Sequence, residues 1–159
     1  MDPLIRAIDD HLLLLRQAQA RPDYRRRLLK GVEGVSGVGT LRVLRSIERA
    51  EARGQAPAIG QVARDLEVEQ STASRAINET TKRGLTVRRP CADDQRQVLL
   101  ELTDLGRQAA LRATGNRQEM VAEALADWSE EDVSRFSRLF GAFVEVLSQV
   151  EPKEDDIGD

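Results

Sequence analysis

The sequence predicts a mostly α-helical protein with a single β-hairpin in its middle. Apolar residues recur at helical spacing over most of the 159 residues, and only two short stretches have the character of β-strands. Aromatic residues make up only 3% of the chain, so its core must be built from Leu, Val, Ile and Ala. We therefore expect a thin, elongated fold or a core shared between two copies of the chain.

The first predicted helix covers residues 3–19. Asp2 suits the N-cap position, and Pro3 suits the first turn because its missing N–H would be unpaired there. The apolar run Leu12–Leu15 is far shorter than the roughly 20 residues that cross a membrane. We expect this part of the helix to be buried on more than one side.

Further helices are expected up to the middle of the chain. A short one at 24–32 leads into the glycine-rich stretch 31–40, which we predict to be a loop because glycine costs about 1 kcal/mol in a helix interior. Helical spacing returns over 41–53, and a short helix is predicted over 58–68. The next helix, 69–84, ends at a glycine, with two cationic residues in its last turn, where they suit the helix dipole.

The two β-type stretches, 85–89 and 97–102, are joined by the polar segment 90–96, which predicts a hairpin with a long tip. A long helix over 103–128 and a last helix over 129–150 follow. The last helix opens on a sequence that resembles a capping box. A short helix, a turn, a second helix and then a hairpin is the element order of a winged helix-turn-helix.

The helix 69–84 carries the strongest chemical signal in the chain. Its apolar stripe consists of Ala73, Ala76 and Ile77, so the opposite face points outward. Short hydrogen-bonding side chains and one arginine above small alanines are what a helix needs to enter a DNA groove and touch base edges. Arg75 could make a bidentate contact to guanine, worth about 1–3 kcal/mol of discrimination. The candidate contact residues on this face are Gln70, Ser71, Thr72, Ser74, Arg75 and Asn78.

Arginines on both sides of the hairpin tip fit the same function. Arg88 and Arg89 lie at a strand end, where phosphates would pass, and Arg96 lies at the tip, where it could enter a minor groove. Asp94 could hold the Arg96 guanidinium extended by charge-assisted hydrogen bonds. The alternative is that Asp94 and Arg96 form an ordinary surface ion pair worth less than about 1 kcal/mol.

These motifs resemble those of the multiple antibiotic resistance regulator (MarR) family of bacterial winged helix-turn-helix transcription factors. The similarity is specific over 62–106, and the matching stretches read VARDLEV, STASRAINETTKRGL, VRR, DQR and LTDLG. Four residues depart from the family pattern. Ala73 replaces a larger β-branched residue, Glu67 a frequent turn glycine, Thr80 a usual leucine, and Thr86 a usually apolar strand residue.

The resemblance implies how the chain is organised. N-terminal dimerisation helices would occupy 1–40, the DNA-binding lobe 41–103 and C-terminal dimerisation helices 104–150, with an acidic tail at 151–159. The chain would act as a homodimer on a pseudo-palindromic site in double-stranded DNA. The two half-sites would lie about one helical turn apart. It would repress a promoter and be released by a small aromatic or anionic ligand.

Other functions find less support in the sequence. The chain has one histidine, His11, and one cysteine, Cys91, which cannot build a metal site within a subunit. We find no motif for a cofactor or for catalysis and expect no enzyme; one cysteine and no signal peptide indicate a cytoplasmic protein. The alternatives left open are a winged-helix protein-interaction module that does not bind DNA and a regulator that senses oxidants through Cys91. The formal net charge of −3 does not exclude DNA binding, because charges are screened over about 8–10 Å and a local basic surface acts almost independently of a distant acidic one.

Overall fold

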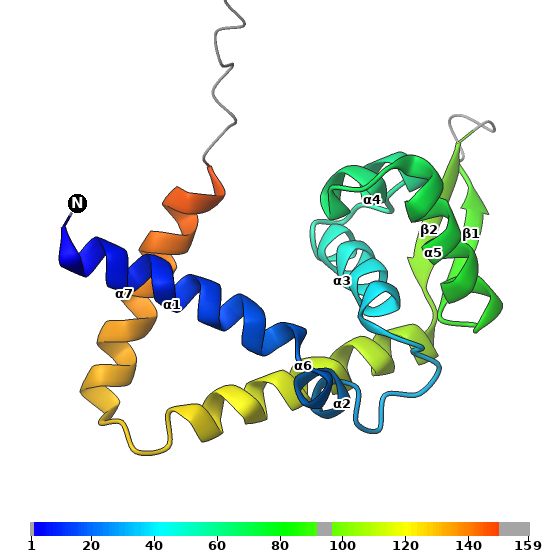
Figure 1. The fold of residues 1–159 in the computed structure, drawn as a ribbon. Coiled ribbons are helices and arrows are strands. Elements are labelled where there is room, and N and C mark those ends of the chain that lie inside the picture. The colour runs from blue at the N-terminus through cyan, green and yellow to red at the C-terminus, as the bar shows by residue number, and fades with distance from the viewer. Residues whose placement is uncertain (1, 92–96, 150–159) are drawn as a thin grey trace, which may run out of the picture. The chain divides into compact units, whose positions relative to one another are not determined.

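The computed structural model describes residues 2–91 and 97–149, and it divides at Glu119 and Met120 into two units. The first unit holds a helix-turn-helix, a hairpin and the helices around them (Figure 1). Its helices are α1 (Pro3–Ala20), α2 (Pro22–Leu28), α3 (Val38–Ala52), α4 (Ile59–Leu66) and α5 (Gln70–Lys82). The strands are β1 (Thr86–Pro90) and β2 (Val98–Leu102), after which α6 (Asp104–Ala124) runs from the first unit into the second, where α7 (Glu130–Ser148) follows. The expected fold class, mostly α with a winged helix-turn-helix, is confirmed.

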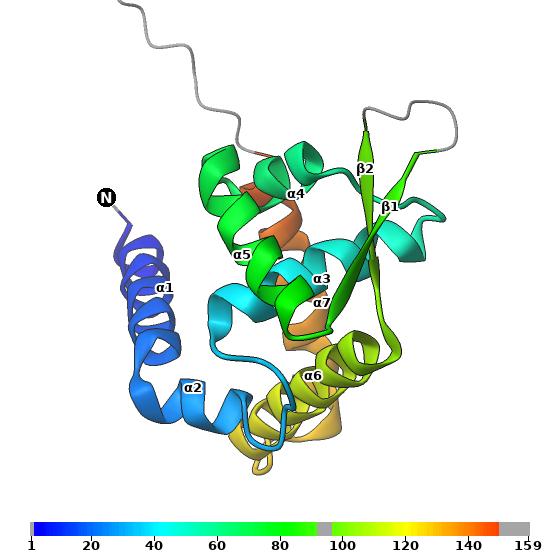
Figure 2. The ribbon, with the colours of Figure 1, turned by 90° about the vertical axis from the view of Figure 1, so that its right-hand side faces the viewer.

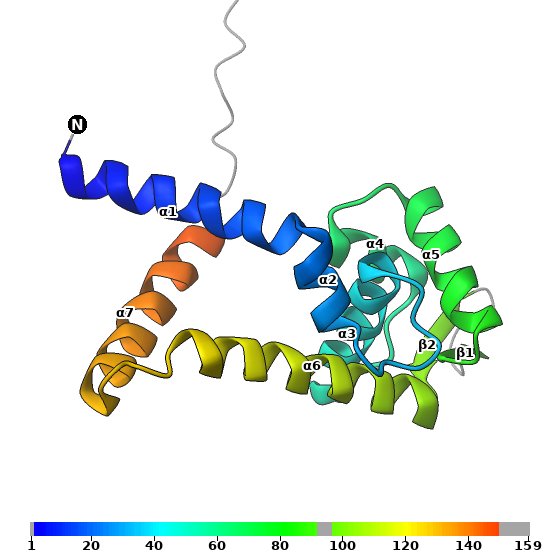
Figure 3. The same cartoon turned by 60° about the horizontal axis from the view of Figure 1, so that its bottom comes forward.

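The N-terminal helix is interrupted where proline enters. The side chain of Asp2 accepts a hydrogen bond from the Leu4 amide at 2.8 Å, which confirms the predicted N-cap. Arg21 is extended and Pro22 opens α2, so the chain changes direction between the two helices (Figure 3). No residue of α1 is buried within the chain, which contradicts the expectation that Leu12–Leu15 is buried on more than one side. The leucines Leu13, Leu14 and Leu15 are about half exposed.

The core of the first unit is aliphatic, as its composition predicts, and α3 lies at its centre. Helices α4 and α5 and strand β2 all pack against α3. The side chains of Val43, Leu44, Ile47, Val62, Ile77, Leu85 and Leu100 are fully buried. Burial of one such side chain stabilises the fold by about 1.5–3 kcal/mol, which makes this the largest favourable term in the lobe.

The hairpin is antiparallel and continues onto the loop before α4. Thr86 pairs with Leu102 at its foot and Pro90 with Val98 at its far end. The amide of Leu100 also donates to the Pro57 carbonyl at 2.9 Å, and Ala58 forms a bridge with Leu99. Figure 2 shows the hairpin rising beside α5. The helix-turn-helix and the hairpin therefore share one framework.

Several helix boundaries differ from those expected. Helix α2 covers Pro22–Leu28 rather than 24–32. Helix α3 begins at Val38, inside the glycine-rich stretch, rather than at 41. A Cβ at Gly37 or Gly39 would meet nothing within 4 Å, so packing does not require glycine at either position. Helix α6 ends at Ala124 rather than at 128. The capping-box-like start of α7 is confirmed, since Ser129 accepts from the Asp132 amide at 3.1 Å.

The second unit is small and contains the aromatic side chains of the chain's C-terminal part. Trp128 meets Phe136 edge to face with ring centroids 5.4 Å apart, and Phe136 stacks on Phe140 at 5.3 Å. No residue of α7 is buried. None of the described helices is long and apolar enough to cross a membrane.

The foot of the hairpin is the tightest junction of the lobe. The Thr103 hydroxyl donates to the Gly84 carbonyl at 2.6 Å and accepts from the Gly106 amide at 3.0 Å, which joins the end of α5 to the start of α6. A Cβ added to Gly106 would lie 2.0 Å from the Leu85 carbonyl oxygen. The motif LTDLG therefore has a steric reason: only glycine lets these two backbones approach so closely.

We expect Gly106→Ala to destabilise the protein by about 1–3 kcal/mol or more, because the methyl group must push the α6 and hairpin backbones apart. Gly115→Ala is the matched control, since it lies on the same helix and its Cβ would meet nothing within 4 Å. It should raise stability by up to about 1 kcal/mol through helix propensity. Denaturant unfolding of both variants checks this, and equal stabilities would contradict the steric reading.

Candidate nucleic-acid interface

Helix α5 presents the predicted face to solvent. Its inner residues Ala73 and Ile77 are fully buried against the core of the lobe. The side chains of Gln70, Ser71, Thr72, Arg75 and Asn78 are exposed, and that of Ser74 is half-buried. Arg75 has no hydrogen-bond or ion-pair partner among the described residues, which leaves its five donors available. Helix packing thus brings five of the six candidates together on one exposed surface, with Ser74 at its edge.

The N-terminus of α5 carries no side-chain cap. Glu69 is the N-cap residue, but its side chain accepts no hydrogen bond from the first turn. No side chain therefore caps the first-turn amides, which remain available to bind a phosphate group. Glu67, in the preceding turn, adopts the left-handed conformation with φ 53°. This explains why glycine is frequent at that position in the MarR pattern, and for Glu67 it costs roughly 1 kcal/mol.

The two strand arginines are both held by neighbours. The Arg88 Nη2 donates to Asn78 Oδ1 at 2.6 Å, which links β1 to α5. The Arg89 Nε donates to Glu101 Oε2 at 2.6 Å across the hairpin. That ion pair is largely solvated, with side chains 65% and 34% exposed, so it is worth less than about 1 kcal/mol and is easily exchanged for a phosphate. The sequence pattern did not reveal either partner.

The hairpin tip lies outside the described residues. Asp94 and Arg96, the two candidates there, therefore stay predictions. Cys91, just before the tip, is half-buried, and its amide donates to the Gln97 carbonyl at 2.9 Å. That bond keeps the two strands paired up to the last described residue on either side.

Two departures from the MarR pattern compensate for each other. Thr80 on α5 and Thr86 on β1 are both buried, and their hydroxyls lie 2.8 Å apart. Thr80 also donates to the Ile77 carbonyl at 2.7 Å, and Thr81 lies 3.0 Å from the Thr86 hydroxyl. Each hydroxyl therefore has a further partner besides the other, and together these bonds satisfy two buried hydroxyls that would cost about 1–3 kcal/mol each if left unpaired. The pair fixes β1 against the end of α5.

Two partly exposed salt bridges link further elements of the first unit. Arg49 binds Asp65 at 2.6 Å and so ties α3 to α4. The hydrogen bond from Arg49, followed by one from Ser46, lowers the pKa of Asp65 below its ordinary value. Arg107, at the start of α6, binds Glu51 on α3 and donates to the Leu102 carbonyl.

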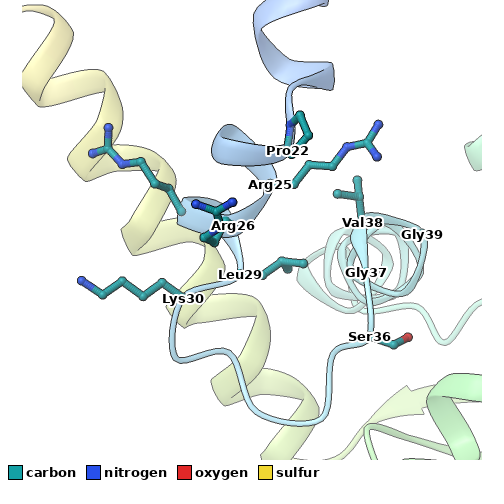
Figure 4. Close-up of a pocket in the computed structure, with 10 residues that line it drawn as sticks. Pro22, Arg25, Arg26, Leu29, Lys30, Ser36, Gly37, Val38 and Gly39 are labelled. Atoms are coloured by element: carbon teal, nitrogen blue, oxygen red, sulfur yellow. The ribbon is translucent and has the colours of Figure 1, made fainter.

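A separate cationic cavity of about 1130 Å³ lies between α2 and the start of α3. Its lining includes Arg25, Arg26, Leu29 and Lys30 from the α2 region. Figure 4 shows Arg25 reaching over Val38 at the start of α3, while Lys30 points away from that helix. Sequence reasoning missed this cavity, although the arginine run at 25–27 beside a glycine-rich loop was a signal for it.

Comparison with known proteins identifies the fold. No family model matches the sequence, and no curated protein matches it. Among solved structures, the MarR family transcription regulator SP03579 superposes with a TM-score of 0.72 at 18% identity, covering 92% of this chain and 91% of that one. A MarR family protein from Bacillus stearothermophilus gives 0.72 at 17%, covering 94% and 99%. A MarR transcriptional regulator from Methanosarcina mazei Go1 gives 0.70 at 15%, covering 92% and 99%.

The chain is therefore a winged helix-turn-helix protein. More particularly, it has the fold of the MarR regulators, over nearly its whole length and nearly the whole length of theirs. The fold that the sequence resemblance implied is confirmed. At identities below a quarter, the likeness carries the fold and leaves the function to be argued from the chain's own surfaces.

The paired threonines yield a test by double-mutant cycle. Thr80→Val and Thr86→Val should each cost about 1–2 kcal/mol, because each leaves a buried hydroxyl with fewer partners. The double variant should cost less than the sum by about 1 kcal/mol, since both hydroxyls then leave together. Unfolding in denaturant measures all four proteins, and strictly additive costs would show that the two hydroxyls are independent.

Proposed function

We propose that this protein is a homodimeric, sequence-specific DNA-binding regulator of transcription, and most simply a repressor. The exposed face of α5 is the single observation that carries this proposal. It combines small polar side chains with Arg75, which has no partner among the described residues, above a buried alanine and isoleucine stripe. Such a helix fits the major groove, where its donors and acceptors meet base edges.

The arginines of the hairpin also support DNA binding. Arg88 and Arg89 stand on β1 beside α5, so they lie where the backbone of a bound duplex would run. In this proposal Arg96 enters the adjacent minor groove and Asp94 holds it extended. The net charge of −3 does not oppose this interaction, because charges act over only about 8–10 Å in physiological salt and the cations nearest the duplex dominate.

A second copy of the chain is the proposed partner for the uncovered apolar faces. Leu4, Ile5 and Ile8 on α1 are 73%, 57% and 45% exposed. On α7, Leu139, Phe140, Phe143 and Leu147 are also exposed. Apolar faces of this length are rarely left in water by soluble proteins. In the proposed dimer, 1–40 and 104–150 supply the interface and 41–103 the DNA-binding lobes, which face two half-sites of a pseudo-palindrome.

Ligand-controlled release completes the proposal. The cavity lies between α2, in the predicted dimerisation region, and α3 of the DNA-binding lobe. Its cationic lining suits a small anionic ligand, including an aromatic one. A ligand there would release DNA only if it binds the DNA-incompetent arrangement of the lobes more tightly. Arg25 is the side chain that we expect to contact the anion, because it reaches over the start of α3 (Figure 4).

We expect Arg75→Ala to weaken binding to the preferred DNA by about 10- to 100-fold and to relax base preference at one position of each half-site. Arg96→Ala should weaken binding and flatten its dependence on salt. Arg112→Ala, which removes an exposed guanidinium from α6, is the control and should change little. Titrations at fixed salt measure all three; unaltered binding by both test variants, with the dimer folded, would favour the protein-interaction alternative.

For the cavity, we expect benzoate to raise the melting temperature of the full chain and benzamide, its neutral analogue, to raise it less. Any compound that binds only the folded state stabilises it in proportion to the logarithm of its concentration. Arg25→Gln should abolish the difference between the two compounds, whereas Arg64→Gln, an exposed arginine of α4 that does not line the cavity, should keep it. Equal shifts in melting temperature with both compounds would show that the negative charge of the ligand does not contribute to binding.

A further inference from the structure

The hydrogen bond between Arg88 and Asn78 determines which way the asparagine amide faces. Arg88 Nη2 donates to Asn78 Oδ1 at 2.6 Å, from β1 to the outer face of α5. A guanidinium has donors only, so the amide atom that faces it must be the oxygen. The amide –NH₂ group of Asn78 therefore points away from Arg88.

This orientation changes what Asn78 can read in a groove. An unrestrained asparagine recognises adenine with both ends of its amide: the oxygen accepts from N6 and the nitrogen donates to N7. Here the oxygen is engaged by a cation. The positive charge also disfavours a base amino group nearby and favours a base carbonyl oxygen. The oxygen keeps a second lone pair, but the guanidinium beside it opposes an approaching amino group, so the –NH₂ donors are the favoured contacts for a base.

Resting on the function proposed above, we infer that Arg88 makes Asn78 contact bases through its –NH₂ donors rather than through its oxygen. At the base that it faces, Asn78 selects guanine or thymine, whose O6 and O4 acceptors it can contact, over cytosine, which offers an amino group, and over adenine, whose N7 acceptor lies beside an amino group that the cation disfavours. Arg88 is then a positioning residue for specificity rather than only a contact to phosphate.

The neighbouring cations do not share this role. Arg89 is bound to Glu101 on the other strand, and Arg83 is bound to Glu79 one turn earlier on α5. Arg89 is thus a matched comparison: it is adjacent in sequence, equally cationic and exposed, and directed to a different partner.

The test is selection of bound sequences from random duplex DNA at one salt concentration, with the full-length protein and four variants. Asn78→Ala identifies the base position, since that position should lose its preference. There the unaltered protein should favour guanine or thymine by about 5- to 10-fold. Arg88→Met should shift the preference toward adenine, because the amide oxygen is freed. Arg88→Lys, which still donates, and Arg89→Met should keep the original preference.

Three results would overturn the inference: a preference for adenine or cytosine at that position, no position altered by Asn78→Ala, or an Arg88→Met variant that binds every sequence more weakly by one factor. The last result would make Arg88 a phosphate contact, and the salt slope of binding would then fall by about one. Melting temperatures confirm that each variant folds. If a folded protein enriches no sequence at all, the proposed function itself fails, which is distinguishable from these three results.

Discussion

The packing of α5 against the foot of the hairpin is the constraint on which the rest of the structure depends. The Leu85 carbonyl lies against Gly106, Thr103 bonds to the Gly84 carbonyl, and a buried hydroxyl pair joins Thr80 to Thr86. These contacts hold a helix and a hairpin as one rigid element. In the proposed DNA complex this rigidity would let α5 and the hairpin use groove and backbone at once, because a duplex offers the two at a fixed separation.

The same rigidity arranges the charges. Arg75 is left without a partner among the described residues, whereas Arg88 and Arg89 are each oriented by a polar neighbour. Pre-oriented side chains lose less conformational freedom on binding than free ones. Helices α1 and α7 contain no buried residue, and their exposed apolar faces are the observation on which the proposed dimer rests.

Much of the fold could be predicted from the sequence, because apolar spacing, helix caps and the LTDLG motif are local signals. The hairpin strands were placed within a residue, and α5 exposed five of its six predicted contact residues. The rest depended on long-range geometry. The partners of Arg88 and Arg89, the cavity beside α2, and the burial of Thr80 against Thr86 arise from elements that meet only in the fold. The expected burial of Leu12–Leu15 was wrong because apolar periodicity shows which face of a helix is apolar, not whether another element covers that face.

The single cysteine offers the most direct test of the central claim that α5 and the hairpin together face a duplex. An iron chelate attached to Cys91, at the end of β1, would cleave any DNA strand that runs beside it. The account predicts two clusters of cuts, symmetric about the centre of the selected site and flanking the bases that depend on α5. Cuts scattered along the duplex, or an uncut duplex that is nevertheless bound, would place the hairpin away from DNA and contradict the account.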